Sequence, residues 1–234
     1  MKILLPGLDS QVNLLLQKVD LTDKTIAIFG ASSLPIAIKL LDKKAKKISI
    51  VIEDLELYLI DKINFENKFQ NLIDKITIFN DEYLSFKGDD KFDIVYAQNS
   101  LTGSERNLIL KNIKNLLTQD GILCIGEIVV LRSDIPKSFR DFFSTYSIAP
   151  LEADKFEKYF NERGFKTLAI GEDKYSLDKY YEEIANLFEK NKNNIFDFSN
   201  NPEKLIKRTK HDIDLYLKFG MKKITNFISG IFQL

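Results

Sequence analysis

The chain has 234 residues, 44% of them apolar, and its 34 Lys and Arg residues are balanced by 34 Asp and Glu residues. This composition is typical of one globular domain with an appendage, and zero net charge argues against nucleic acid as the main partner. A single cysteine, Cys124, excludes an intramolecular disulfide, and with His211 as the only histidine we expect no cysteine cluster or multi-histidine metal site.

Apolar runs in this sequence are short. None reaches the roughly 18 residues that would predict a membrane span, and the apolar stretch at the start is too short for a signal peptide. We therefore expect a cytoplasmic protein with no membrane partner.

Short apolar runs alternate with helical patterns through the first 170 residues. In chain order, the patterns predict a helix at 10–19, a strand at 25–29, a helix after the serine cap at 32–33, a strand at 47–52, a helix at 55–69, and strands at 76–79 and 92–97. They continue with a helix at 104–117, a turn at 119–121, a strand at 122–130, a helix at 152–163 and a strand at 165–170. Such alternation predicts an α/β fold with a mainly parallel, doubly wound sheet.

After Gly171 the pattern changes to helices without intervening strands. Apolar residues recur at helical spacing over 177–188, a linker occupies 191–201, and Pro202 opens a second helix. The last ten residues are rich in β-branched and aromatic types and predict a terminal strand. We expect a core at 1–172, a helical insertion or cap at 173–222, and the last core strand at 223–234.

The turn that follows the first strand is the first candidate binding segment. Ligands of open α/β sheets bind at the carboxyl ends of the strands, where Gly30, Ala31 and Ser32 would lie before a helix N-terminus. Glycine allows the backbone to approach a ligand closely. With only one glycine the motif is weak, and taken alone it favours a plain strand-to-helix turn.

Two acids, Glu53 and Asp54, follow the second strand. An acid about 20 residues after a glycine turn can accept hydrogen bonds from the two hydroxyls of a ribose. Acids at the start of a helix are also favoured by the helix dipole alone, so both interpretations stay open.

Polar residues also follow the third and fourth strands. A carboxylate at Asp81 or Glu82 could receive the exocyclic amine of an adenine ring, and Gln98 could line the ligand crevice. A polar loop is the alternative explanation for Asp81 and Glu82, and for Gln98 a plain loop before a helix is the favoured interpretation.

The order of these segments resembles class I S-adenosylmethionine-dependent methyltransferases. The segments that carry the resemblance are TIAIFGASS, ISIVIED, ITIFNDEYLSF, KFDIVYAQNSL, LLTQDGILCIGEIVV and FEKYFNERGF, within residues 5–172, with 224–234 similar to the family's last strand. The resemblance implies a Rossmann-like sheet of seven strands in the order 3-2-1-4-5-7-6, with S-adenosylmethionine as cofactor. It also implies methyl transfer to an unidentified small molecule by direct displacement at the sulfonium methyl.

The family's site residues transfer to this sequence position by position. Its glycine-loop contact corresponds to Gly30, its ribose acid to Glu53 or Asp54, and its adenine acid to Asp81, with Glu82 following. The turn also departs from the family pattern. Ile28 stands where the family has an acid, and the second and third glycines are replaced by Ser32 and Leu34.

Three other functions remain open at this stage. A degenerate binding or scaffold protein would explain the missing glycines, whereas an NAD(P)-dependent oxidoreductase would explain a glycine turn followed by an acid. A nucleic-acid methyltransferase is disfavoured by the zero net charge. No catalytic base is identified: Cys124 reads as a buried small residue, and His211 as a surface residue.

We hypothesise that residues 131–150 and 174–221 form a cap over a small-molecule substrate. Their aromatic side chains are numerous enough to line an apolar pocket: Phe142, Phe143, Tyr146, Tyr180, Tyr181 and Tyr216. The same aromatics could instead form the interface of a homodimer.

Overall fold

Seven strands form one sheet in the order β3-β2-β1-β4-β5-β7-β6 in the computed structural model, which describes residues 2–88, 90–191 and 202–234. The pairs β1–β2, β1–β4, β2–β3 and β4–β5 are parallel, and β7 is antiparallel to both β5 and β6. The predicted fold class and strand order are therefore confirmed. The predicted linker at 191–201 lies, except for its first residue, outside the described residues.

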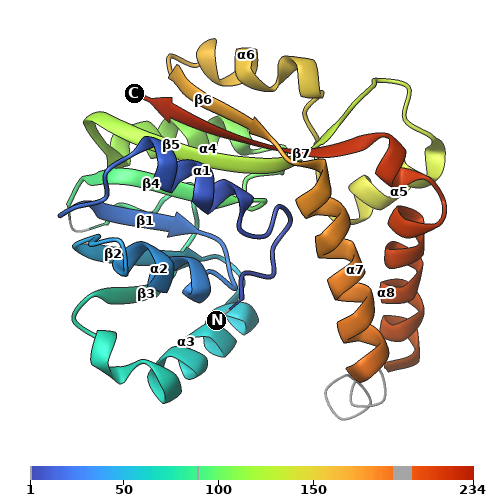
Figure 1. The fold of residues 1–234 in the computed structure, drawn as a ribbon, viewed down its shortest axis with the longest axis horizontal. Helices are drawn as coiled ribbons and strands as arrows, with labels where there is room; N and C mark the ends of the chain where they lie inside the picture. The colour runs from blue at the N-terminus through green and yellow to red at the C-terminus, as the bar shows by residue number, and fades with distance from the viewer. Residues whose placement is uncertain (1, 89, 192–201) are drawn as a thin grey trace.

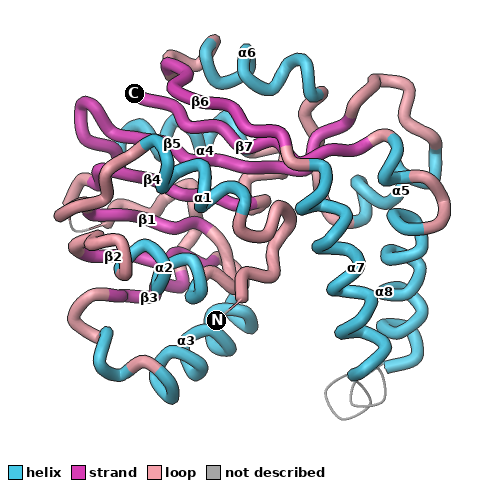
Figure 2. The backbone as a smooth tube through the Cα atoms, viewed as in Figure 1, coloured by secondary structure: helices cyan, strands magenta, loops and turns pink. Residues whose placement is uncertain are grey.

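Helices cover both faces of this sheet (Figures 1 and 2). The strands are β1 (Thr25–Phe29), β2 (Lys47–Ile52), β3 (Ile76–Asn80), β4 (Phe92–Gln98), β5 (Leu117–Val130), β6 (Lys166–Glu172) and β7 (Thr225–Gln233). The α-helices are α1 (Ser10–Lys18), α2 (Leu34–Leu41), α3 (Leu55–Lys68), α4 (Arg106–Leu116), α5 (Lys137–Thr145), α6 (Phe156–Asn161), α7 (Lys174–Asn191) and α8 (Pro202–Leu217). Short 3₁₀ turns are η1 (Gln70–Leu72), η2 (Ala153–Lys155) and η4 (Met221–Lys223).

Two elements differ from the sequence prediction. The expected turn at 119–121 is wrong, because β5 begins at Leu117 and pairs there with β4. Phe92 pairs with Leu117 and Ile94 with Ile122, so residues 118–121 bulge opposite Asp93. The second difference is α5, a helix absent from the sequence prediction, in which Phe139, Phe142 and Phe143 recur at helical spacing.

Side chains of the central strands alternate between two cores. Ile26 and Ile28 of β1 pack beneath α1 and α2, whereas Ala27 and Phe29 pack on the opposite face against α4. Burial on both faces explains why these strands are continuous apolar runs. A third core joins α5, α7 and α8 to the ends of β5 and β7. In Figure 1 this helical group lies beyond the carboxyl ends of the parallel strands.

A buried glutamine holds α1 against the sheet. The Gln11 side chain is completely buried, and its Nε2 donates to the carbonyl oxygens of Ala97 (3.0 Å) and Cys124 (3.2 Å). Gly126 of β5 makes this close approach feasible, because a Cβ there would lie 2.2 Å from Gln11 Oε1 and 2.6 Å from the Phe227 ring.

Within the described ranges, no helix has the length and apolar character needed to cross a membrane.

Replacing Gly126 with Ala should destabilise the fold by about 1–3 kcal/mol, because the added methyl group overpacks the contact with Gln11. Urea unfolding measures this loss. Gly103→Ala is the matched control, since its added Cβ meets only the Ser147 carbonyl oxygen at 3.7 Å. Equal stability of the two variants would show that α1 does not pack against β5 as described.

Candidate functional site

The turn between β1 and α2 packs closely against the turn that follows β4. Gly30 has a φ of +133°, and a Cβ at this position would lie 3.1 Å from Ser100 Cβ. The Ser100 hydroxyl donates to the Phe29 carbonyl oxygen (2.6 Å), and the Ser33 hydroxyl donates to the Gly30 carbonyl oxygen (2.8 Å). The backbone conformation therefore favours glycine here, and the space for a Cβ beside Ser100 is tight. Ala31, the next residue, is half-buried beside this contact.

A carboxylate of the protein itself occupies the N-terminal side of α2. Ser32 adopts a left-handed φ of +58°, and its N–H donates to Asp61 Oδ2 at 2.6 Å. Asp61 comes from α3 and is buried, and this burial raises its pKa although the hydrogen bond from Ser32 opposes the shift. The sequence analysis missed Asp61. Its spacing from Tyr58 and Phe65, which share the inward face of α3, was the available signal.

Leu34, which replaces the third glycine of the family pattern, does not point over the turn. Its side chain is buried in the core beneath α1 and α2, together with Val12 and Ile28. Leu34 thus stabilises the packing of the start of α2 against the sheet and does not narrow the turn.

The two acids after β2 have different roles. Asp54 is the N-cap of α3, and its Oδ1 accepts the Leu57 N–H at 2.9 Å. Glu53 turns the other way, and its Oε1 accepts the Tyr83 N–H at 2.8 Å. Partial burial raises the pKa of Glu53, a shift that the Tyr83 hydrogen bond opposes. Glu53 therefore links the end of β2 to the segment that follows β3.

Two exposed acids follow β3, and the next residue is buried in the core. Asp81 and Glu82 are both exposed, and Asp81 Oδ1 accepts the Glu82 N–H at 2.8 Å. Tyr83 is buried and stacks on Phe29, the last residue of β1, with ring centroids 4.9 Å apart. The stack fixes this segment beside the Gly30 turn.

Gln98, at the end of β4, is buried and uses both ends of its amide within the protein. Its Oε1 accepts the Tyr96 hydroxyl at 2.6 Å, and its Nε2 donates to the carbonyl oxygens of Pro6 (2.8 Å) and Leu8 (2.9 Å). Gln98 thus anchors the N-terminal segment. The next residue, Asn99, accepts the Ile128 N–H at 3.3 Å.

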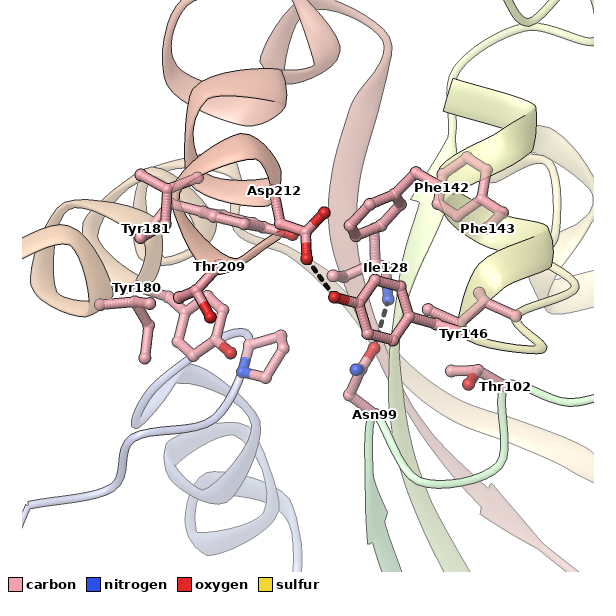
Figure 3. A pocket seen from close by; sticks show the side chains of 14 residues that line it. Asn99, Thr102, Ile128, Phe142, Phe143, Tyr146, Tyr180, Tyr181, Thr209 and Asp212 are labelled. Atoms are coloured by element: carbon pink, nitrogen blue, oxygen red, sulfur yellow. Dashed lines mark hydrogen bonds between the residues drawn. The ribbon is translucent and has the colours of Figure 1, made fainter. Parts of the chain in front are cut away.

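A pocket of about 460 Å³ opens at the carboxyl ends of β4 and β5. The end of β4 contributes Asn99 and Thr102, and the aromatic wall comes from α5 and α7, with α8 on the remaining side (Figure 3). Five aromatic side chains line it: Phe142, Phe143, Tyr146, Tyr180 and Tyr181. Residues from 142–148, 180–184 and 209–213 therefore meet at one pocket on the carboxyl edge of the sheet.

Tyr216 does not line this pocket, contrary to expectation. It is fully buried behind Tyr181, with the two rings stacked at a centroid distance of 3.7 Å and an angle of 6°. Its hydroxyl group hydrogen-bonds Asp178. Tyr216 therefore supports the wall of the pocket and joins α7 to α8.

The pocket and the glycine turn are neighbours. Asn99 lines the pocket, and Ser100, the next residue, contacts Gly30. A ligand at the turn and a ligand in the pocket would therefore meet across the end of β4.

A buried ion pair supports the loops around this edge. Arg106 Nη2 lies 2.8 Å from Glu127 Oε2, and Arg106 also donates to the carbonyl oxygens of Leu101 (2.8 Å) and Ala149 (2.9 Å). Glu127 is completely buried, and this desolvation raises its pKa to about 7 although Arg106 opposes the shift. In the sequence, the position of Glu127 within the apolar run of residues 122–130 was the available indication of a buried charge.

The two residues considered for catalysis lie outside this site. Cys124 is fully buried within β5, and burial raises the pKa of its thiol to about 12. His211 is exposed on α8 and is not among the pocket-lining residues.

No protein-family model and no curated protein matches the sequence. Among solved structures, a Galdieria sulphuraria protein assigned as a sarcosine dimethylglycine methyltransferase superposes with a TM-score of 0.77 at 15% identity, over 95% of this chain and 83% of that chain. The [4+2]-cyclase SpnF gives a TM-score of 0.75 at 16% identity, over 96% of this chain and 80% of that chain.

A methyltransferase from Thiobacillus denitrificans that uses S-adenosylmethionine, crystallised with S-adenosylhomocysteine, gives a TM-score of 0.71 at 11% identity, over 95% of this chain and 89% of that chain. These likenesses show that the chain has the fold of class I S-adenosylmethionine-dependent methyltransferases. The cyclase shows that one fold serves more than one reaction.

The raised pKa of Glu127 predicts a pH-dependent difference between the wild type and Glu127→Gln. In the folded protein Glu127 loses its proton around its raised pKa of about 7, whereas in the unfolded chain it does so near the ordinary pKa of 4.5. Between these pH values the native state binds more protons, so wild-type stability should fall as pH rises relative to the variant, then level off.

Urea unfolding at pH 4.5, 6 and 8 measures this difference in the free energy of unfolding. Glu157→Gln on α6, an exposed position, is the control and should follow the wild type. Parallel profiles for the wild type and Glu127→Gln would contradict the assignment of a raised pKa to Glu127.

Proposed function

We propose that this chain is an S-adenosylmethionine-dependent methyltransferase that acts on a small molecule in the pocket beside β4. The observation that carries the proposal is the juxtaposition of three features at one sheet edge: the Gly30 turn, the Glu53 carboxylate after β2, and the pocket that begins at Asn99. Open α/β sheets bind nucleotide-like ligands at this edge.

The residues at the end of β2 and β3 fit the nucleoside part of this cofactor. Asp54 is engaged as a helix cap, which leaves Glu53 as the acceptor for the ribose hydroxyls through its second oxygen, Oε2. Asp81 and Glu82 are exposed and would accept from the adenine amine. Gly30 and Ala31 would supply the close backbone approach, because the Ser32 N–H is already paired with Asp61.

The protein's part in the reaction is binding and exclusion of water. S-Adenosylmethionine supplies an electrophilic methyl, and the acceptor's lone pair forms the new bond as the carbon–sulfur bond breaks. The aromatic walls of α5 and α7 would hold the acceptor in a largely apolar site, and alignment of two bound reactants supplies much of the rate enhancement. We assign no general base.

A second candidate function is a binding or scaffold protein that has lost catalysis. The Asp61 carboxylate on the Ser32 N–H favours it, because it places a negative charge where the turn would otherwise accept an anionic group. An NAD(P)-dependent oxidoreductase is the third candidate, supported only by the glycine turn and the acid that follows it.

We also propose that the reaction takes place in the cytoplasm and that the main partner is the small-molecule substrate. The single cysteine, which is buried, suits a reducing compartment, and the balanced charge disfavours nucleic acid. A homodimer through the helical group of α5, α7 and α8 is the alternative use of its aromatic side chains.

Glu53→Gln should weaken binding of S-adenosylmethionine and S-adenosylhomocysteine about tenfold, because the variant loses charge-assisted hydrogen bonds to the ribose. Isothermal titration calorimetry measures the two affinities. Glu56→Gln, an exposed residue in the first turn of α3, is the matched control and should bind as the wild type does.

Titration with NAD(H) in parallel separates the candidate functions. Binding of NAD(H) without S-adenosylhomocysteine would favour the oxidoreductase, and binding of neither would favour the scaffold. Unchanged affinity in Glu53→Gln would show that the ribose lies elsewhere.

A further inference from the structure

We propose that the pocket between α5, α7 and α8 selects a small apolar amine in its cationic form. As a methyl acceptor, this ligand rests on the proposed function, and its ammonium group would first lose a proton to solvent, because only the free amine has the lone pair that forms the new nitrogen–carbon bond. The preference of the pocket for a cation does not, because it follows from the pocket's own charge and aromatic lining.

The charge of the pocket comes from one carboxylate. Among its fourteen lining residues, Asp212 of α8 is the one acidic or basic side chain, since the lining contains no other Asp, Glu, Lys, Arg or His. Its Oδ2 accepts a hydrogen bond from the Tyr146 hydroxyl, and Figure 3 shows the carboxylate between the aromatic side chains of α5 and α7. A carboxylate in such surroundings is stabilised by a positive ligand group, which replaces the water it loses on ligand binding.

Arg208 of α8 is a cation that contacts Tyr146. Its Nε donates to the Tyr146 hydroxyl at 3.2 Å, and its guanidinium lies 4.6 Å from the centre of the Tyr146 ring. Arg208 is exposed and is not a lining residue, so solvent screens its charge. Among the lining residues, Asp212 is thus the charged side chain that a ligand would meet.

The aromatic rings strengthen this preference. Phe142 and Phe143 of α5 lie across the pocket from Tyr180 and Tyr181 of α7, with Tyr146 beside Asp212 (Figure 3). Aromatic faces attract ammonium groups, and the attraction is stronger where water is excluded. The apolar surface of the same rings suits a hydrocarbon body.

Other ligand classes match these features less well. A carboxylate or phosphate would be repelled by Asp212. A neutral alcohol would bury the same apolar area, yet it would leave the Asp212 charge without a positive partner. The volume of about 460 Å³ is within the range of small-molecule sites.

The test is calorimetric titration of the purified full chain, without nucleotide, with three probes of similar shape: 2-phenylethylamine, 2-phenylethanol and 3-phenylpropionate. The amine should bind about tenfold or more tightly than the alcohol, since a charge-assisted contact is added, and the carboxylate should bind most weakly.

Two variants locate the preference. Asp212→Asn should reduce amine affinity to that of the alcohol while leaving alcohol affinity unchanged. Asp214→Asn is the control on the same helix, because Asp214 is outside the pocket lining and pairs with Lys218. It should bind all three probes as the wild type does.

Equal affinities of the wild type for amine and alcohol, or no binding of the amine, would overturn the inference, even if Asp212→Asn failed to fold. Amine selectivity that survives in Asp212→Asn would overturn it as well. Titration of the same wild-type sample with S-adenosylhomocysteine keeps the two proposals apart. Amine selectivity without nucleotide binding would refute the proposed function alone, whereas nucleotide binding without amine selectivity would refute this inference alone.

Discussion

The candidate site depends on the carboxyl end of β4. Two buried glutamines hydrogen-bond the neighbouring segments to this end of the strand. Gln11 joins α1 to the carbonyl groups of β4 and β5, and Gln98 joins the end of β4 to the N-terminal segment. Buried amide groups need partners, so these bonds fix the segments that border the site. The pocket wall at Asn99 and the contact of Ser100 with Gly30 follow from this arrangement.

Three acids around this edge meet three different electrostatic environments. Asp61 accepts a backbone N–H at the start of α2, Glu127 is paired with Arg106 inside the core, and Asp212 faces an aromatic pocket. Only Asp212 is placed to act on a ligand in that pocket. Asp61 and Glu127 instead stabilise turns, and Asp61 supplies a carboxylate of the protein itself on the N-terminal side of α2.

The strands were predictable because their pattern is local. Parallel strands buried on both faces are continuous apolar runs, so β1 and β2 lie at the predicted residues. The start of β5 was not predictable, because residues 118–121 resemble a turn and become a bulge only through pairing with β4. The α5 helix, by contrast, has a local helical pattern in the sequence, with Phe139, Phe142 and Phe143 on one face.

The sequence by itself determined the fold class, because the alternation of apolar runs and helical patterns decides it, and with it the sheet edge where a ligand would lie. The strand order was implied by the resemblance of the ordered segments to class I S-adenosylmethionine-dependent methyltransferases. Only the tertiary structure decided the roles of single polar residues. Asp54 caps α3, whereas Glu53 accepts the Tyr83 N–H. Gln98 hydrogen-bonds the N-terminal segment, and Tyr216 stacks on the buried side of Tyr181 instead of lining the pocket. The physical reason is that a hydrogen bond or a ring stack depends on a partner placed by folding, often from a distant part of the chain, and no local pattern encodes that partner.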